Sequence, residues 1–253
     1  MQKMVVGNWK MYVNSLADGK KLIKSIDAKF PRGVKSAVIV CPPNALSIAL
    51  RNAYGGKRIS FGAQDAYWEQ EGAHTGMTSP RSLALSGISH VLIGHAERRA
   101  LGDSNEIVAK KLSAAFEAGL NPILCIGEKA RDQDGSHFTE LAKDVTQSLA
   151  RLDASAAQRL TIAYEPVWAI GAAEAPQPRI AEEAIVYIRK TIADVWGRER
   201  ALKIRIIYGG AVDSMSASAF AKHRGIQGVL LGRASVDADE FTKVIKAFGQ
   251  NAA

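Results

Sequence analysis

The chain has 253 residues, of which 47% are hydrophobic and 23% are charged, a balance typical of a folded globular protein. No apolar run approaches the roughly 20 residues that a membrane-spanning helix needs, and the start of the chain lacks the layout of a signal peptide. The formal net charge of +8 is spread along helix-like segments without a nucleic-acid-binding motif, so we expect neither nucleic acid nor a membrane as a partner.

Strand-like runs of apolar residues recur along the whole chain. They are residues 4–6, 38–40, 59–63, 91–93, 123–126, 160–164, 204–208 and 229–231. Each run is continuous rather than alternating, which is typical of strands that are buried on both faces of a parallel sheet.

Helical patterns fill the gaps between these runs. Asp103 with Glu106 three residues later resembles a capping box, Gly119 marks the end of the helix that follows, and Pro178 is placed to begin a later one. Basic pairs on such helices predict solvated faces; a positive field that attracts a small anionic substrate is the second interpretation. These pairs include Lys20-Lys21, Lys110-Lys111 and Arg189-Lys190.

Eight strands that alternate with helices favour a closed (β/α)8 barrel, a single domain over residues 1–253, with a doubly wound open sheet as the competing architecture. The polar residues favour the barrel. Asn8, His95 and Glu165 each follow or end an apolar run, and the C-terminal ends of strands are where barrel enzymes carry their active sites.

The two cysteines, Cys41 and Cys125, each lie in or beside a strand-like run. We interpret both as reduced, buried thiols of a cytoplasmic protein rather than as a disulfide or a metal pair. The sequence contains no ligand cluster and no cofactor motif, so we expect neither a metal nor a cofactor.

Three polar residues at strand ends are candidates for catalysis. Glu165 ends a buried strand just before Pro166 and an apolar segment, so that a lid could exclude water from a carboxylate that acts as a general base. Lys10 would direct an ammonium group toward an anion or an enolate oxygen. His95 precedes a helical segment whose N-terminus disfavours the imidazolium, and a neutral His can polarise a carbonyl.

Two glycine-rich turns follow the last two strands, at residues 208–211 and 232–235. Glycine lets backbone N–H groups converge on a phosphate. In barrels, the loops after the seventh and eighth strands often build a phosphate site.

Four motifs together resemble the triosephosphate isomerase family, in its order and spacing and over essentially the whole chain. They are GNWK at 7–10, GHAERR at 94–99, AYEPVWAIG at 163–171 and YGG at 208–210.

The resemblance implies a cofactor-free isomerisation of dihydroxyacetone phosphate and glyceraldehyde 3-phosphate. Glu165 would remove a proton beside the carbonyl, and neutral His95 would donate to the carbonyl oxygens, the pair for which this family is known. Lys10 would stabilise the negative charge, and Asn8 would orient the substrate. Glu97 would position Lys10 or His95.

The resemblance also implies a phosphate site and a lid over residues 166–176. The phosphate would be held by backbone N–H groups of Gly171, Ala211, Gly232 and Arg233. In the family, a Ser after YGG and the YGG tyrosine hold the closed lid, but this chain has Ala211, without a hydroxyl, and Pro176, without an N–H. We therefore expect that both lid bonds are missing, each worth ~0.5–1.5 kcal/mol.

Two further departures concern Arg233 and Met77. Arg233 replaces the second glycine of the family's phosphate turn, so that its guanidinium would pair with Glu174 of the lid, contact the phosphate, or point to solvent. A long loop, residues 64–79, matches the family's loop in which a Thr, here Thr75, inserts into a partner, so we expect a homodimer. Met77 replaces a Glu that pairs with an Arg of the neighbour, here Arg98.

Alternative functions are an isomerase of a four-carbon ketose phosphate and, less in keeping with the sequence, a non-catalytic barrel. The altered lid and Arg233 favour the former. The presence of Lys10, His95 and Glu165 argues against the latter.

Overall fold

The computed structural model describes residues 1–132, 134–172 and 175–250. The strands are β1 (Met4–Asn8), β2 (Ala37–Cys41), β3 (Ser60–Ala63), β4 (His90–Ile93), β5 (Asn121–Ile126), β6 (Thr161–Tyr164), β7 (Arg205–Gly209) and β8 (Gly228–Leu231). The α-helices are α1 (Leu16–Ala28), α2 (Asn44–Ala53), α3 (Pro80–Leu85), α4 (Ala96–Ala100), α5 (Asn105–Glu117), α6 (Ser136–Ser148), α7 (Pro178–Trp196), α8 (Arg198–Lys203), α9 (Ala217–Lys222) and α10 (Ala238–Gln250). Short 3-10 helices cover Ala154–Gln158, Val167–Ala169 and Arg233–Val236.

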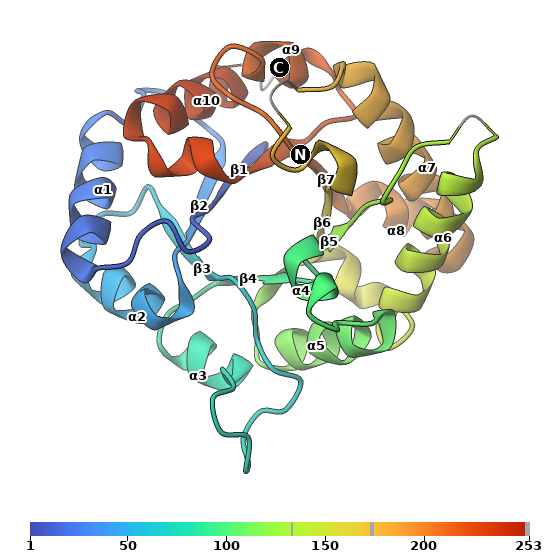
Figure 1. Ribbon diagram of the computed structural model, residues 1–253, viewed down its shortest axis with the longest axis horizontal. Coiled ribbons are helices and arrows are strands. Elements are labelled where there is room, and N and C mark those ends of the chain that lie inside the picture. The colour runs from blue at the N-terminus through green and yellow to red at the C-terminus, as the bar shows by residue number, and fades with distance from the viewer. Residues whose placement is uncertain (133, 173–174, 251–253) are drawn as a thin grey trace.

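The strands form one closed parallel barrel in chain order, in which β1 pairs with both β2 and β8. Figure 1 shows the strands as a central ring with the helices around it. The predicted (β/α)8 barrel is confirmed. Because all strands run in one direction, their C-terminal ends share one rim of the barrel.

Each strand is buried on both faces, which explains why the apolar runs do not alternate. Met4 and Val6 of β1 belong to a cluster inside the barrel, whereas Val5 belongs to the layer between strands and helices. Cys41 and Cys125 lie in the inner cluster as free, buried thiols. Pro178 is the first residue of α7, as its ring geometry favours.

The predicted capping box is wrong. Ser104, not Asp103, caps α5, because its Oγ accepts a hydrogen bond from the Ile107 N–H at 3.3 Å. Asp103 is buried and accepts a hydrogen bond from Lys111 Nζ at 2.6 Å. A carboxylate this deep needs a cation as partner, which the adjacent helix supplies.

The expected solvated basic faces are also wrong at two positions. The Lys111 side chain is only 3% exposed, since its ammonium pairs with Asp103 and, at 2.9 Å, with Asp65. Arg189 donates to the carbonyl oxygens of Ala201 and Ile204 at the C-terminal end of α8. Basic residues on the inward faces of these helices therefore connect the helices to neighbouring elements instead of facing solvent.

Candidate active site

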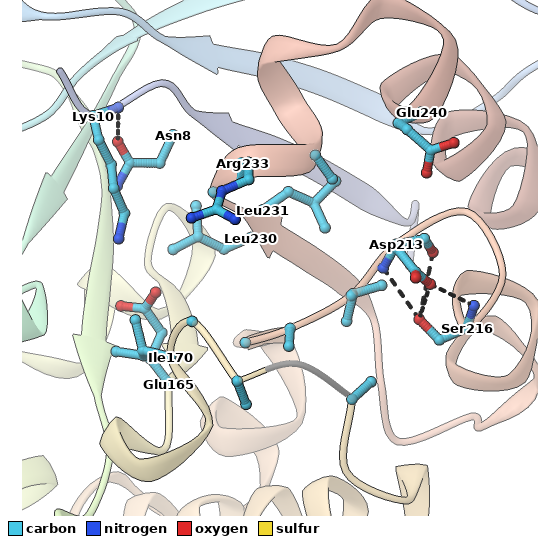
Figure 2. A pocket seen from close by; sticks show the side chains of 18 of the residues that line it. Asn8, Lys10, Glu165, Ile170, Asp213, Ser216, Leu230, Leu231, Arg233 and Glu240 are labelled. Carbon is cyan, nitrogen blue, oxygen red and sulfur yellow. Dashed lines mark hydrogen bonds between the residues drawn. The ribbon is translucent and has the colours of Figure 1, made fainter. Parts of the chain in front are cut away.

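A cavity of about 730 Å³ opens at the C-terminal rim of the barrel. Its lining contains every predicted catalytic and phosphate-binding residue except Glu97: Asn8, Lys10, His95, Glu165, Gly171, Ala211, Gly232 and Arg233. Figure 2 shows Lys10, Glu165 and Arg233 directed into this space. Closure of the barrel thus brings together residues from β1 to the loop after β8, at opposite ends of the sequence.

Lys10 adopts a left-handed backbone conformation with φ of 46°, the one positive φ of a non-glycine residue in the described ranges. Such a conformation costs about 1–2 kcal/mol for a residue with a Cβ. Two side-chain amides hold it in place. The Lys10 N–H donates to Asn8 Oδ1 at 3.0 Å, and its C=O accepts from Gln64 Nε2 at 2.9 Å.

Glu97 lies behind Lys10 rather than on the cavity wall. Lys10 Nζ donates to Glu97 Oε1 at 2.6 Å. Partial burial acts to raise the pKa of Glu97, but the hydrogen bond and charge of Lys10 outweigh it, and the pKa lies below its ordinary value. Glu97 is therefore a charged contact that directs the ammonium, without touching the cavity.

The His95 ring is anchored at the start of α4. It is the N-cap of α4, and its Nδ1 accepts a hydrogen bond from the Glu97 N–H at 3.2 Å. An acceptor Nδ1 places the proton of a neutral imidazole on Nε2.

The Glu165 carboxylate lies opposite this imidazole. Glu165 is 6% exposed, and its Oε1 lies 3.7 Å from His95 Nε2, too far for a hydrogen bond. Its Oε2 is buried and has no hydrogen-bond partner among the described residues. Both the carboxylate and the Nε2–H are thus left for two neighbouring atoms of a ligand.

Glu128 is a functional residue that sequence reasoning missed. It is 1% exposed, and its Oε1 accepts hydrogen bonds from Tyr164 Oη at 2.8 Å and Trp168 Nε1 at 3.0 Å. The N–H of Val167 donates to its carbonyl oxygen at 2.9 Å. Glu128 thereby fixes the first turn of the lid; its position two residues after β5 was the available signal.

The four predicted phosphate ligands converge on one side of the cavity. Gly171 has φ of 74°, a conformation that favours glycine, and lies on the lid. The N–H groups of Ala211 and Gly232 have no acceptor among the described residues. The Gly232 carbonyl oxygen accepts two hydrogen bonds from Ser235, one from the N–H at 2.9 Å and one from Oγ at 2.6 Å.

One of the two lid bonds that we expect to be missing would involve the hydroxyl of Tyr208. Its hydroxyl is buried and finds no hydrogen-bond partner within the described ranges, and burial raises its pKa. This agrees with the expectation that Pro176, which has no N–H, offers it no partner. Glu174, the possible partner of Arg233, lies outside the described residues, as does Ala173.

The loop around Thr75 projects from the barrel between β3 and α3 (Figure 1). Its base is closed by a hydrogen bond from the Tyr67 N–H to the Thr78 carbonyl at 2.8 Å, and Thr75 is exposed. Met77 is also exposed.

Arg98 has a partner within its own chain. Its Nε lies 3.0 Å from Asp65 Oδ2 and 3.8 Å from Asp103 Oδ2. With Lys111 these residues form a network of two cations and two carboxylates beneath the loop, so Arg98 is engaged although Met77 offers no charge.

Metal-binding clusters of three or more His, Cys, Asp or Glu do not occur in the part of the chain that the structure describes. None of the described helices combines the length and the apolarity that a membrane crossing requires.

Comparison with known proteins agrees with this geometry. The family model of triosephosphate isomerase matches residues 3–248. The chain is 38% identical to the triosephosphate isomerases of Carboxydothermus hydrogenoformans (96% of this chain and 97% of the relative) and Moorella thermoacetica (96% and 97%). It is also 38% identical to that of Fusobacterium nucleatum (98% and 99%). The chain therefore belongs to the triosephosphate isomerase family and is an isomerase.

Proposed function

We propose that this chain interconverts dihydroxyacetone phosphate and D-glyceraldehyde 3-phosphate through an enediolate, without a cofactor. The observation that carries the proposal is the 3.7 Å approach of the buried Glu165 carboxylate to Nε2 of His95. The same cavity holds the Lys10 ammonium. A base, a hydrogen-bond donor and a cation are what a proton transfer beside a carbonyl requires.

Glu165 removes a proton from the carbon next to the carbonyl, and the electron pair moves onto the carbonyl oxygen. His95 donates its Nε2–H to that oxygen and moves a proton between the two oxygens of the enediolate. The protonated Glu165 then returns its proton to the adjacent carbon. Lys10, placed by Glu97, stabilises the negative charge, and Asn8 orients the substrate.

The phosphate is held by the backbone N–H groups of Gly171, Ala211, Gly232 and Arg233. When the lid closes, it excludes water and restricts rotation about the bond to the phosphate-bearing carbon. Both effects oppose elimination of phosphate from the enediolate. The contact between Glu128 and Trp168 supports a lid that moves about a fixed first turn.

The first test is a coupled assay of dihydroxyacetone phosphate isomerisation in the parent, Glu165→Gln and Glu140→Gln. General bases contribute about 10²–10⁴-fold, so Glu165→Gln is expected to lose about 10³-fold in kcat. Glu140 is exposed on α6, far from the cavity lining, and serves as the matched control. An inactive parent, or an active Glu165→Gln, would contradict the proposal.

The second candidate is isomerisation of a four-carbon ketose phosphate, which Ala211 and Arg233 favour because they change the phosphate side of the cavity. The same assay with three- and four-carbon substrates separates the two. A non-catalytic barrel is disfavoured by the common orientation of Lys10, His95 and Glu165 toward one cavity.

We also propose a cytoplasmic homodimer that serves glycolysis and gluconeogenesis and binds neither nucleic acid nor membranes. The exposed loop around Thr75 supports the dimer. Light scattering of Thr75→Arg tests it, because a long charged side chain at a buried tip should give monomers. A mass unchanged from a dimeric parent would argue for another interface, and a monomeric parent would contradict the dimer.

A further inference from the structure

We propose that the Arg233 guanidinium is a side-chain ligand of the substrate phosphate, a second cation of the cavity beside Lys10. The inference rests on the proposed function, in that the substrate is a phosphate ester. It goes beyond the backbone contacts described above, because it gives Arg233 a role in affinity and specificity.

The fold places this side chain at the phosphate side of the cavity. Arg233 begins a 3-10 helix directly after Gly232, which follows β8. Figure 2 shows its guanidinium directed into the pocket on the side of Lys10, and away from Asp213 and Glu240. The guanidinium thus extends toward the interior of the cavity.

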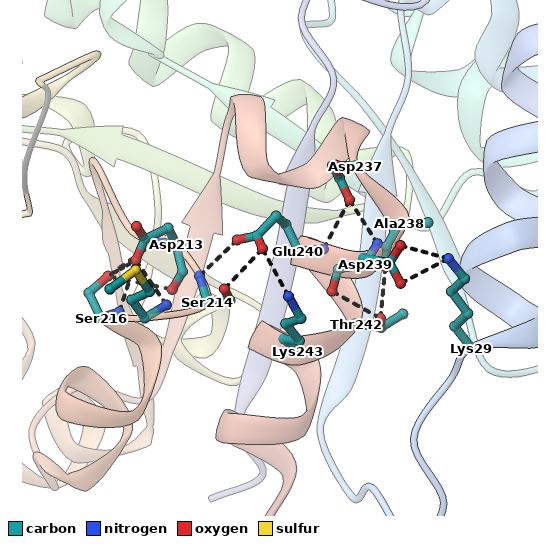
Figure 3. A network of polar contacts seen from close by, with 11 residues as sticks. Lys29, Asp213, Ser214, Ser216, Asp237, Ala238, Asp239, Glu240, Thr242 and Lys243 are labelled. Carbon is teal, nitrogen blue, oxygen red and sulfur yellow. Dashed lines mark hydrogen bonds and ion pairs between the residues drawn. The ribbon is translucent and has the colours of Figure 1, made fainter.

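Two of the carboxylates that line the cavity, Asp213 and Glu240, already have other partners. Asp213 accepts hydrogen bonds at the start of α9, including one from the Ser216 N–H at 2.8 Å. Glu240 accepts from Ser214 Oγ at 3.0 Å, within the polar network that Figure 3 shows. Among the described residues the Arg233 guanidinium has no hydrogen-bond or ion-pair partner. Within the described ranges it is therefore an unpaired cation in the cavity.

The phosphate turn lies next to both cations. A Cβ built on Gly232 would lie 3.6 Å from Lys10 Cε, an ordinary van der Waals contact. The Gly232 carbonyl is held by the buried Ser235, which leaves the N–H side of the turn to the cavity. An anion on this turn therefore lies within reach of Lys10 and Arg233 together.

A guanidinium suits this position because its planar fork binds two phosphate oxygens at once. Arg233 is exposed, so that solvent weakens the pair, and we expect a contribution of about tenfold in affinity. A side-chain ligand on the rigid rim does not depend on the lid. It offsets the lid bonds that Ala211 and Pro176 cannot form.

The test measures binding of inorganic phosphate by ³¹P NMR titration to the parent, Arg233→Gln, Arg233→Lys and Arg200→Gln. Arg200 lies exposed on α8, so Arg200→Gln makes the same change in net charge away from the cavity. We expect the Kd for phosphate to rise about tenfold in Arg233→Gln, to change less in Arg233→Lys, and to stay within about twofold in Arg200→Gln. Equal affinities of Arg233→Gln and Arg200→Gln, or a parent that binds no phosphate, would overturn the inference.

Isomerase kinetics separate this inference from the proposed function. Because the phosphate does not react, Arg233→Gln should raise KM more than it lowers kcat. If the parent is inactive but still binds phosphate through Arg233, the proposed reaction is refuted and the proposed role of Arg233 as a phosphate ligand stands. If the parent is active but its phosphate affinity does not depend on Arg233, the proposed role of Arg233 is refuted and the proposed reaction stands.

Discussion

Replacing Gly209 with Ala is expected to displace Glu165, the proposed catalytic base, while leaving the barrel intact. Gly209 ends β7 beside Glu165, and a Cβ there would lie 2.3 Å from Glu165 Cγ and 2.9 Å from Oε1. Ordinary contacts begin at 3.4 Å. The carboxylate must therefore move by about 1 Å to accommodate one methyl group.

The main chain of Glu165 cannot absorb this shift. Its N–H donates to the Ile126 carbonyl at 2.7 Å, and a Cβ on Gly127 would lie 2.0 Å from its carbonyl oxygen, so that the backbones are in close contact. The side chain alone must rotate. A misplacement of about 1 Å near the chemistry costs about 10²-fold in rate, and the overpacking costs about 1–3 kcal/mol of stability.

The assay is kcat for triose phosphate isomerisation together with the Tm of each variant. Gly55→Ala is the control, because a Cβ at Gly55 meets no atom within 4 Å and its φ is not in the left-handed region. Gly209→Ala should lose about 100-fold in kcat with a Tm lowered by a few degrees, and Gly55→Ala should match the parent in both. If Gly209→Ala folds and keeps most of the parent's kcat, the reasoning is refuted, because the rate would then not depend on the position of the Glu165 carboxylate.

Two further predictions concern stability. Lys111→Met should lower the free energy of unfolding by about 3 kcal/mol, because it leaves the buried Asp103 with only the Arg98 guanidinium, 3.8 Å away. Lys110→Met should cost less than about 0.5 kcal/mol, since its partner Glu106 is exposed. Urea unfolding measures both, and equal effects would contradict the argument. Burial, with a smaller effect of Arg205, lowers the pKa of His90 to about 4 from 6.5. The unfolded chain therefore takes up a proton first, and about 3 kcal/mol of stability present above pH 6.5 should be lost by about pH 4. His90→Gln should remove that part of the pH dependence; parallel curves for the two proteins would contradict it.

The sequence was sufficient for the barrel because strands buried on both faces leave continuous apolar runs. It also located Asn8, Lys10, His95 and Glu165, since each follows or ends such a run and parallel strands bring those ends to one rim. The placement of Lys111 could not be predicted, because burial of an ammonium depends on carboxylates from β3 and the start of α5 that meet only in the folded chain. The sequence pattern could not distinguish Ser104 from Asp103 as the N-cap of α5 for the same reason. Either residue type can cap a helix, and Asp103 is not the cap because it pairs with the buried Lys111.

Glu128 was missed for a related reason. A carboxylate two residues after a strand is no more distinctive than many surface carboxylates. Its role rests on Tyr164 and Trp168, which lie about forty residues away and approach it only because β5 and β6 are neighbours. Local patterns thus identify residues that end strands, whereas they do not identify the contacts between adjacent loops.

Three buried polar groups without hydrogen-bond partners among the described residues bear on how strongly this cavity binds a ligand. Glu165 Oε2, Glu128 Oε2 and the Tyr208 hydroxyl are all buried without hydrogen-bond partners in the described ranges, and all lie at the C-terminal rim. Lys10 adds a strained backbone at the same rim. A buried polar group without a partner costs about 1–3 kcal/mol. Where a ligand supplies the missing partner, that free energy contributes to binding instead of folding. The unliganded rim is therefore less stable than it would be if these polar groups had partners.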